Sequence, residues 1–570
     1  MKKIILIAAS AALAFSAGAQ TMYDAITFSQ SNYYGTARTM GLNNAVTAVG
    51  GDLGTIGINP AGSAVSYYGQ FTLTPGITIS SVGSQYSNWG ESKYVPGAEG
   101  RNTRFNLPNC GISMSFATGR DRGLKNMTFA FVSNQTNNYN MAFQGFGRNN
   151  MTSRYAELAT AAYGYDEGVL AEYSSFNCSN VPWDVLAAYQ AGTFGSYEKD
   201  EYSGYVGNTE RIAPDGSYHY VPGELSQGSS VSKWGSKNDI VINMGMNFND
   251  NLYAGFNIGI PAMDYRYSEY FSEAPVNVEQ FPIAFKEGDT YLRSVTSDYQ
   301  YIADVSGIYA KAGLIWLPVK GLRLGAAIQS PTALTVRECW QYGATSSFQN
   351  SKFDGDVISP EGEYSYGIRT PYIVNLGAAV TIGTVGLISV DYELADYSVI
   401  KFRDIYDEGG FRDNSAFYDL NMTSRNFCGL AHNLRAGAEF RVTPAFSLRA
   451  GYSLATNPER HWINSAGMDV TADDYLQNFG DYNTGVLSLV SSEYYREFTQ
   501  SYSLGFGYSS PGSFFADFAV RATSYPESVF APYYDYYGYT STGELLDMQA
   551  PRIKFKRNLF DVALTFGWRF

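Results

Sequence analysis

The sequence predicts an all-β protein, a 14-stranded antiparallel transmembrane β-barrel with an N-terminal hatch (plug) inside the lumen. Three observations predict the barrel. Apolar and polar residues alternate along fourteen segments, the connections between these segments are alternately short and long, and the composition is aromatic but poor in charge. Bacterial outer-membrane barrels combine an even number of strands with short turns at one rim and long loops at the other.

The first nineteen residues are expected to be a secretory signal peptide. Lys2 and Lys3 precede an apolar run over residues 4–15, and small residues follow at 17–19. The run is shorter than the roughly 20 residues that a membrane-spanning helix needs, which favours cleavage after Ala19 over a membrane anchor. The mature chain is therefore expected to begin at Gln20 and to be exported.

The composition separates this chain from ordinary soluble domains. Charged residues make up 16% of the chain, whereas soluble domains carry about 25%. Aromatic residues also reach 16%, yet the mean hydropathy is only -0.20. Half-buried strands that end in aromatic girdles give this balance. The net charge of -14 argues against nucleic acid as a partner, because nucleic acid requires a basic face.

The segment 20–68 is predicted to be the hatch, and 69–570 the barrel with its long extracellular loops. The segment lacks two-residue alternation and is rich in Gly, Asn and Ala. It precedes the first strand, so it starts on the periplasmic side, and by its size it can fold back into the pore. A disordered periplasmic tail is the alternative that its glycine content permits.

Two-residue alternation marks the candidate strands, because successive side chains of a strand point to opposite faces. Connections after even-numbered strands are tight and those after odd-numbered strands are long. A soluble sandwich or propeller has no reason to follow that rule. The longest connection, 136–237, contains two helix-like pieces at 155–162 and 183–190. The candidate strands are 70–80, 110–118, 124–135, 238–249, 251–261, 303–317, 322–336, 370–383, 387–397, 428–443, 445–454, 498–509, 513–523 and 558–570.

Charged side chains share one face of the predicted strands. In segment 428–443, arginine and glutamate alternate with leucine, alanine and phenylalanine. An arginine on the lipid face costs about 2–4 kcal/mol at the bilayer midplane, so the charged face is expected to line the lumen and to pair its own charges. Asp517, Arg521 and Arg569 follow the same parity. The principal predicted lumen charges are Asp391, Glu393, Arg435, Glu439, Arg441, Arg449 and Asp561.

The last segment alternates without a fault from Phe560 to the C-terminal Phe570. Its bulky apolar face is expected to meet lipid, and the segment is expected to pair with the first strand. Its aromatic end, Trp568 and Phe570, resembles the signal that the barrel assembly machinery reads.

No catalytic or metal-binding motif occurs. The sequence has no GxSxG, its histidines lack HExxH spacing and its cysteines form no CxxC pair. We predict no enzyme, no metal site and no cofactor, with a lipase of distant Ser and His residues as the minor alternative. One or two disulfides are compatible with an exported chain. The residues concerned are His219, His432 and His461, and Cys110, Cys178, Cys339 and Cys428.

The stretch 45–62, above all GGDLGTIGINPAG, resembles the hatch of the FadL/TodX family of outer-membrane transporters for long-chain fatty acids and hydrocarbons. The motif Asn59, Pro60, Ala61 and Gly62 ends just before the first strand. With fourteen strands and a C-terminal Phe, the resemblance covers the whole mature chain. It implies a monomer in outer-membrane lipid, a plugged lumen, and passive passage of a hydrophobic small molecule. It also implies lateral release near a kink in the third strand, for which residues 134–138 offer a place.

Two functions follow as hypotheses. The first is passive transport of long-chain fatty acids or similar hydrophobic molecules across the bacterial outer membrane. The second is a surface receptor or adhesin, for example for haem, whose long loop 136–237 matters more than its pore. The sequence leaves the ligand and the ligand-contacting residues undecided.

Overall fold

The computed structural model describes residues 21–87, 95–199, 202–212, 219–285, 287–405, 414–494, 497–539 and 545–570. The predicted signal peptide, 1–19, lies outside these residues. Among the residues described, no helix combines the length and the hydropathy needed to cross a bilayer.

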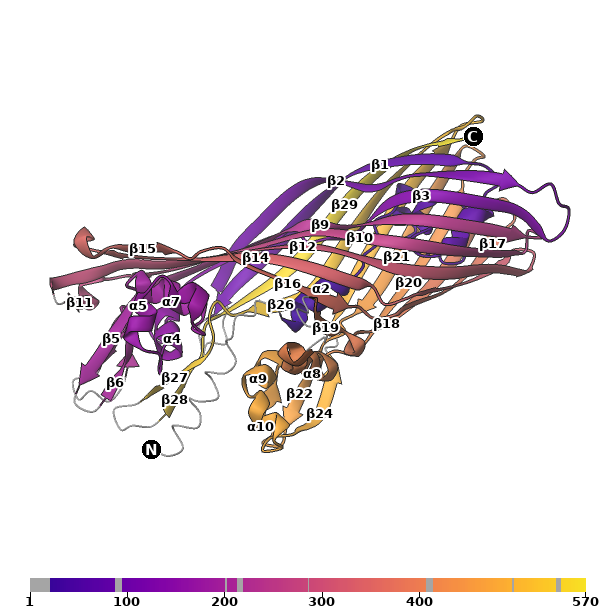
Figure 1. Cartoon of the computed structure of the whole chain (residues 1–570). Coiled ribbons are helices and arrows are strands. Elements are labelled where there is room, and N and C mark those ends of the chain that lie inside the picture. The colour runs from indigo at the N-terminus through magenta and orange to yellow at the C-terminus, as the bar shows by residue number, and fades with distance from the viewer. Residues whose placement is uncertain are drawn as a thin grey trace.

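Fourteen antiparallel strands close into a barrel (Figure 1). We call each of these wall strands a stave, because some of them consist of two strand segments in line. The first and last staves make the closure, pairing from Gln70 opposite Arg569 to Ser87 opposite Arg552. The predicted fold class is therefore confirmed. The staves are β1 (Gln70–Ser87), β2 (Val95–Ala117), β3 (Leu124–Asn138), β9 (Leu225–Phe248), β10 (Leu252–Pro275), β12 (Gly288–Val319), β13 (Leu322–Gln329) with β14 (Ala333–Phe348), β17 (Ile373–Ile382) with β16 (Gly362–Arg369), β18 (Gly386–Asp396), β20 (Leu430–Arg441), β21 (Phe446–Thr456), β25 (Phe498–Ser509), β26 (Phe514–Phe530) and β29 (Arg552–Arg569).

The predicted strands were too short on the side of the long loops. β12 begins at Gly288, fifteen residues before the predicted start at 303. Above the membrane both faces of a strand meet water or other protein, so the apolar alternation that marks a lipid-facing strand fades there. The predicted strand 322–336 is also interrupted, because Pro331 separates β13 from β14 and has no N–H to donate to the ladder.

The long connections build two outer lobes beside the extended staves (Figure 1). The two predicted helical pieces of the longest connection are confirmed as α4 and α7. Two strands of the barrel sheet lead into these lobes: β4 (Met141–Asn149), which pairs with β9, and β19 (Lys401–Asp404), which pairs with β16. The first lobe contains α4 (Arg154–Ala161), α5 (Glu167–Ala171), α6 (Ser175–Cys178), α7 (Trp183–Gln190), β5 (Phe194–Lys199), β6 (Tyr202–Gly207), β7 (Arg211–Ile212), β8 (His219–Tyr220), β11 (Pro282–Phe285), β15 (Gly355–Ile358), β27 (Tyr536–Tyr539) and β28 (Leu545–Met548). The second contains α8 (Tyr418–Phe427), β22 (Arg460–Asn464), β23 (Asp469–Val470), α9 (Ala472–Gln477), α10 (Phe479–Asn483) and β24 (Leu489–Tyr494).

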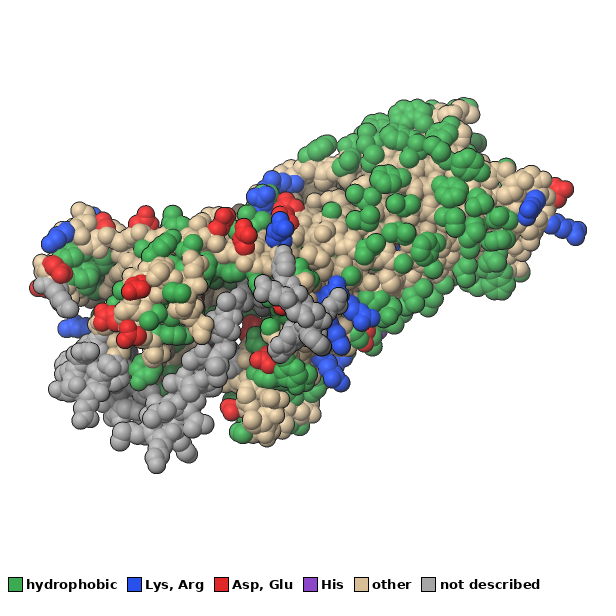
Figure 2. Space-filling model, viewed as in Figure 1, with side chains coloured by type: hydrophobic (Ala, Val, Ile, Leu, Met, Phe, Trp, Pro, Cys, Tyr) green, Lys and Arg blue, Asp and Glu red, His purple; other side chains and the backbone are tan. Residues whose placement is uncertain are grey.

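Outward-facing apolar side chains cover the barrel between the tight turns and the outer lobes, as the green surface in Figure 2 shows. Leu314, Trp316, Leu504 and Phe560 are examples, each with more than a third of its surface exposed. We call this surface the apolar belt. A soluble protein rarely exposes so large a continuous apolar surface, whereas a barrel in lipid requires one.

Residues 21–66, called the hatch below, lie inside the barrel. The segment folds into short helices, and most of its side chains are buried. These helices are α2 (Met22–Ser29), α3 (Ala37–Gly41), η1 (Leu53–Thr55) and η2 (Pro60–Val65).

Candidate functional site

A ring of inward-facing glycines seats the hatch near the tight-turn end of the barrel. A Cβ on Gly255 would collide with the backbone of Pro60, and a Cβ on Gly451 would lie 2.6 Å from the amide nitrogen of Asn43. Side chains at these positions would therefore expel the hatch. The ring consists of Gly245, Gly255, Gly313, Gly325, Gly377, Gly437, Gly451 and Gly505.

The Asn59-Pro60-Ala61-Gly62 motif joins the hatch to the wall. The Asn59 side chain accepts a hydrogen bond from the amide of Ala61 at 3.1 Å and so caps η2, where proline is favoured at the first position. The same side chain donates to the carbonyl of Thr47 at 2.7 Å and to that of Leu314 in β12 at 3.1 Å. The motif thus fixes two hatch turns to one stave.

A chain of ion pairs, partly buried at its hatch end, ties the hatch to the opposite wall. Arg38 of α3 lies 3.0 Å from Glu439, which lies 2.7 Å from Arg449. Arg449 in turn lies 2.5 Å from Asp517. The carboxylate of Glu439 raises the pKa of Arg38 above its usual value, so this guanidinium is charged.

Four more charges form pairs within the wall. Nη2 of Arg435 lies 2.8 Å from Oε2 of Glu393, and Nη2 of Arg521 lies 3.0 Å from Oδ2 of Asp561. All four side chains are largely buried. Arg521 also donates to the carbonyl of Tyr33 in the hatch at 2.8 Å, so a wall pair supports the hatch as well.

The remaining predicted site residues have separate places. Asp391 accepts a hydrogen bond from the backbone of Thr47 at 2.6 Å. Arg441, the last residue of β20, is exposed at the barrel rim. Trp568 and Phe570 are 46% and 63% exposed, on the outer side of the closing stave.

Two buried lysines were not singled out by the sequence analysis. Lys311 in β12 donates to the carbonyl of Gly57 at 2.7 Å and to the hydroxyl of Tyr33 at 3.2 Å. Lys237 in β9 donates to the carbonyl of Phe28 at 3.0 Å. The alternation of their strands could have identified both, because each has the parity of the lumen face.

The third stave bends into the lumen at residues 134–138. Its pairing with β2 stops at Asn109 opposite Asn134, and its register with β9 shifts between Gln135 and Asn137. The chain continues as β4, whose Phe143 stacks on Phe555 of β29 with ring centroids 4.3 Å apart. β2 and β3 therefore part above Asn134, and β4 lies inside the wall.

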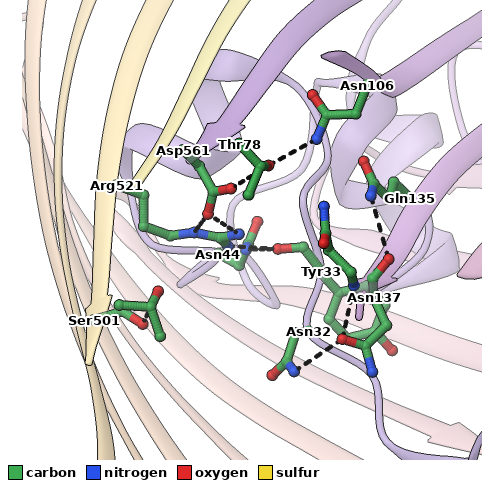
Figure 3. Close-up of polar contacts among 12 residues, drawn as sticks. Asn32, Tyr33, Asn44, Thr78, Asn106, Gln135, Asn137, Ser501, Arg521 and Asp561 are labelled. Atoms are coloured by element: carbon green, nitrogen blue, oxygen red, sulfur yellow. Dashed lines mark hydrogen bonds and ion pairs between the residues drawn. The ribbon is translucent and has the colours of Figure 1, made fainter. Parts of the chain in front are cut away.

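The hatch hydrogen-bonds to the inside of this bend (Figure 3). The amide of Asn32 donates to the carbonyl of Thr136 at 2.6 Å, and that of Tyr34 to the carbonyl of Gln135 at 3.0 Å. The Asn32 side chain also reaches Asn137 at 3.4 Å. The hatch thus satisfies backbone groups that β2 leaves unpaired.

An aromatic strip lies on the inward face of β10, β12 and β14 above the hatch, with Tyr265 and Tyr301 buried and its other members half-buried. The ring centroid of Tyr299 lies 4.5 Å from that of Tyr342, on which it stacks, and 5.9 Å from that of Tyr267. The ring centroids of Tyr301 and Tyr265 are 6.2 Å apart. The strip ends at α2, where Phe28 meets Tyr265 edge to face at 5.6 Å. Such faces can stack on apolar or planar molecules. The strip consists of Tyr265, Tyr267, Tyr299, Tyr301 and Tyr342.

Solved structures of similar architecture exist. A FadL homologue of Pseudomonas aeruginosa is 11% identical and has a TM-score of 0.47, over 93% of this chain and 98% of that one. The toluene transporter TodX of P. putida is 10% identical, with a TM-score of 0.43 over 94% and 98%. The toluene transporter TbuX of Ralstonia pickettii is 11% identical, with a TM-score of 0.42 over 93% and 98%. No family model and no curated protein matches the chain. The barrel assignment rests on the strand pairing described above, not on these likenesses.

The side chains considered for catalysis or metal binding lie apart. Nδ1 of His432 lies 2.7 Å from the hydroxyl of Tyr392, on outward-facing positions of β20 and β18. Cys110, Cys178, Cys339 and Cys428 are all free thiols. In the part of the chain that the structure describes, no group of three His, Cys, Asp or Glu side chains could hold a metal ion.

Proposed function

We propose that this chain is an outer-membrane protein through which hydrophobic small molecules, long-chain fatty acids or similar compounds, diffuse passively. One observation carries the proposal: a barrel with an apolar belt is filled by its own hatch at one end and lined by aromatic side chains at the other. Water and ions lack a path along such a bore, whereas an apolar molecule can exchange water for aromatic surface. The protein acts as a monomer, and its terminal Phe570 serves barrel assembly.

The route begins between the outer lobes, which place the aromatic strip within reach of the medium. A molecule that moves along the strip arrives at Phe28 of α2 and then at the bend of β3. The break between β2 and β3 leads sideways toward lipid, and the hatch backbone at Asn32 and Tyr34 covers its inner side at the bend, with β4 covering it above. We propose lateral release there, because the ring glycines and ion pairs hold the axial path shut.

Reconstituted vesicles test this function. Purified protein in proteoliposomes should take up a radiolabelled long-chain fatty acid faster than protein-free vesicles, without added energy. The same preparation in a planar bilayer should show no large steady conductance. A large conductance that ignores changes in the hatch would indicate a general porin instead.

The receptor hypothesis predicts a different result for one deletion. Residues 150–224 can be replaced by a short linker, because β4 and β9 are neighbouring antiparallel strands. A transporter with this deletion should lose part of its uptake as the mouth of the aromatic strip is damaged. Unchanged uptake together with lost binding of a surface ligand would favour the receptor.

A further inference from the structure

Four outward-facing cations gather where the apolar belt meets the second outer lobe. Arg369 in β16 stands directly opposite Lys401 in β19, and two residues along, Gly367 stands opposite Arg403. Arg337 projects from β14 on the other side of β16. Figure 2 shows Lys and Arg side chains grouped at this border. We call Arg337, Arg369, Lys401 and Arg403 the cationic group.

Nearby carboxylates balance the charges of the cationic group only in part, since the exposed Glu363 of β16 has the same outward parity as Arg369. Like charges directly opposite each other on paired strands repel. Between residues that the structure describes, no ion pair involves any of the four. Asp304 of β12 stands opposite Arg337 but forms no ion pair with it. The four cations outnumber these carboxylates, so this face keeps a positive charge that an anion from outside the chain can bind.

The side chain of Arg403 packs against the outer face of β16, and its Nε–H makes no hydrogen bond. Its side chain crosses Gly367, where an added Cβ would lie 2.6 Å from Nε of Arg403. That Nε is buried and has no hydrogen-bond partner. A buried unsatisfied donor is costly, so a nearby acceptor would stabilise this conformation.

Apolar side chains continue below the cationic group toward the membrane centre. Ile308, Tyr372 and Leu376 are each about half exposed (56%, 50% and 49%) and belong to the apolar belt. A ligand that bridges both surfaces must carry an anion next to acyl chains. Lys and Arg bind phosphate through charge-assisted hydrogen bonds, which arginine can make in pairs.

We propose that the cationic group binds the phosphate of an outer-leaflet glycolipid whose acyl chains lie on Ile308, Tyr372 and Leu376. This proposal rests on the outer-membrane location under the proposed function, because the long loops place the group at the outer leaflet. Its occupant is a lipid and not free phosphate, since the phosphate site continues into the apolar belt.

Native mass spectrometry tests the binding directly. Purified protein, delipidated and re-equilibrated with lipid A, should retain diphosphorylated lipid A and should retain dephosphorylated lipid A much less. The triple variant Arg369→Gln, Lys401→Gln, Arg403→Gln should lower the occupancy of diphosphorylated lipid A by on the order of tenfold, since each cation near an anionic lipid surface adds attraction. The matched control Arg120→Gln, Arg122→Gln, Lys320→Gln removes three exposed cations at the tight turns and should leave occupancy unchanged.

Lipid A binding by one more variant and fatty acid uptake by all variants complete the test. Gly367→Val keeps all four charges but displaces Arg403, and it should also lower occupancy. Equal retention of lipid A with and without phosphates by the unaltered protein would overturn the proposal without any variant. Fatty acid uptake by the same proteins reports on the proposed function separately, because the cationic group lies outside the lumen. Uptake without phosphate-dependent lipid binding would overturn this inference alone.

Discussion

Removing the hatch's ion pair should unseat the hatch without unfolding the barrel. Arg38→Gln deletes the charge that lies 3.0 Å from Glu439, with side chains 21% and 6% exposed. A hydrogen bond to a charged group contributes roughly 1.5–3 kcal/mol. Glu439 keeps Arg449 at 2.7 Å and is not left unpaired, so the lower part of that range applies. About 1.5–2 kcal/mol corresponds to roughly a 10- to 30-fold rise in the unseated population.

Single-channel recordings in planar bilayers measure this population as brief conducting events. Their frequency should rise roughly 10- to 30-fold in Arg38→Gln, while heat-modifiable migration on gels stays that of a folded barrel. Arg441→Gln makes the same chemical change at an exposed position of the stave that carries Glu439 and should leave the frequency unchanged. An equal rise in both variants, or none in Arg38→Gln, would refute the assignment of this pair to hatch seating.

Three other changes have defined outcomes. Asn59→Ala removes the cap of η2 and two donated bonds, and it should raise the same conducting events about 10-fold or more; loss of barrel folding would contradict this. Tyr342→Ala removes the partner of Tyr299 and should weaken binding of a fluorescent fatty acid about fivefold, unlike Tyr502→Ala on the lipid side, which should bind normally. Burial raises the pKa of Glu157 in α4 from its ordinary value of 4.5 to about 8. Folding therefore favours the protonated carboxyl, and the free energy of unfolding that this group contributes is complete below pH 4.5 and is lost as the pH rises through about 8. Amide exchange in α4, corrected for intrinsic rates, should therefore be faster at pH 9 than at pH 6, and Glu157→Gln should reduce that difference; the remainder belongs to Glu210 and Glu273, whose pKa values burial raises to about 7.

The barrel could be predicted because lipid imposes a pattern that water does not. Each stave alternates strictly wherever one face meets lipid, as in β29 from Phe560 to Trp568. Above the belt the same strands continue without that pattern, and there the predicted ends failed. The helices α4 and α7 were recognisable because each repeats apolar residues at helical spacing inside a polar loop.

The contacts that hold the hatch in the barrel could be predicted only in part. The Asn-Pro motif indicated a fixed turn, but its partner Leu314 is distant in sequence, and contacts between distant segments leave no local signal. The ring glycines look like ordinary weak points of strands, such as Gly255 or Gly451. Their meaning appears only when the backbone of the hatch is found against each of them. The family resemblance implied the bend of β3, and residues 134–138 offered a place for it, whereas the pairing of the bend with Asn32 and Tyr34 was not expected.

The contacts of the hatch favour the proposed lateral exit over an axial one. Axial release requires the hatch to leave the glycine ring, to break its pair with Glu439 and to abandon the Asn59 bonds. In the proposed lateral release, Asn32 and Tyr34 give up two backbone bonds to the bend, each of which contributes roughly 0.5–1.5 kcal/mol net, and Asn32 gives up its side-chain bond to Asn137. Thermal motion supplies the second change far more often than the first. Under the proposed function, a ligand that displaces Phe28 of α2 moves the helix that leads directly into Asn32, so its entry would break these bonds while the lower hatch stays seated.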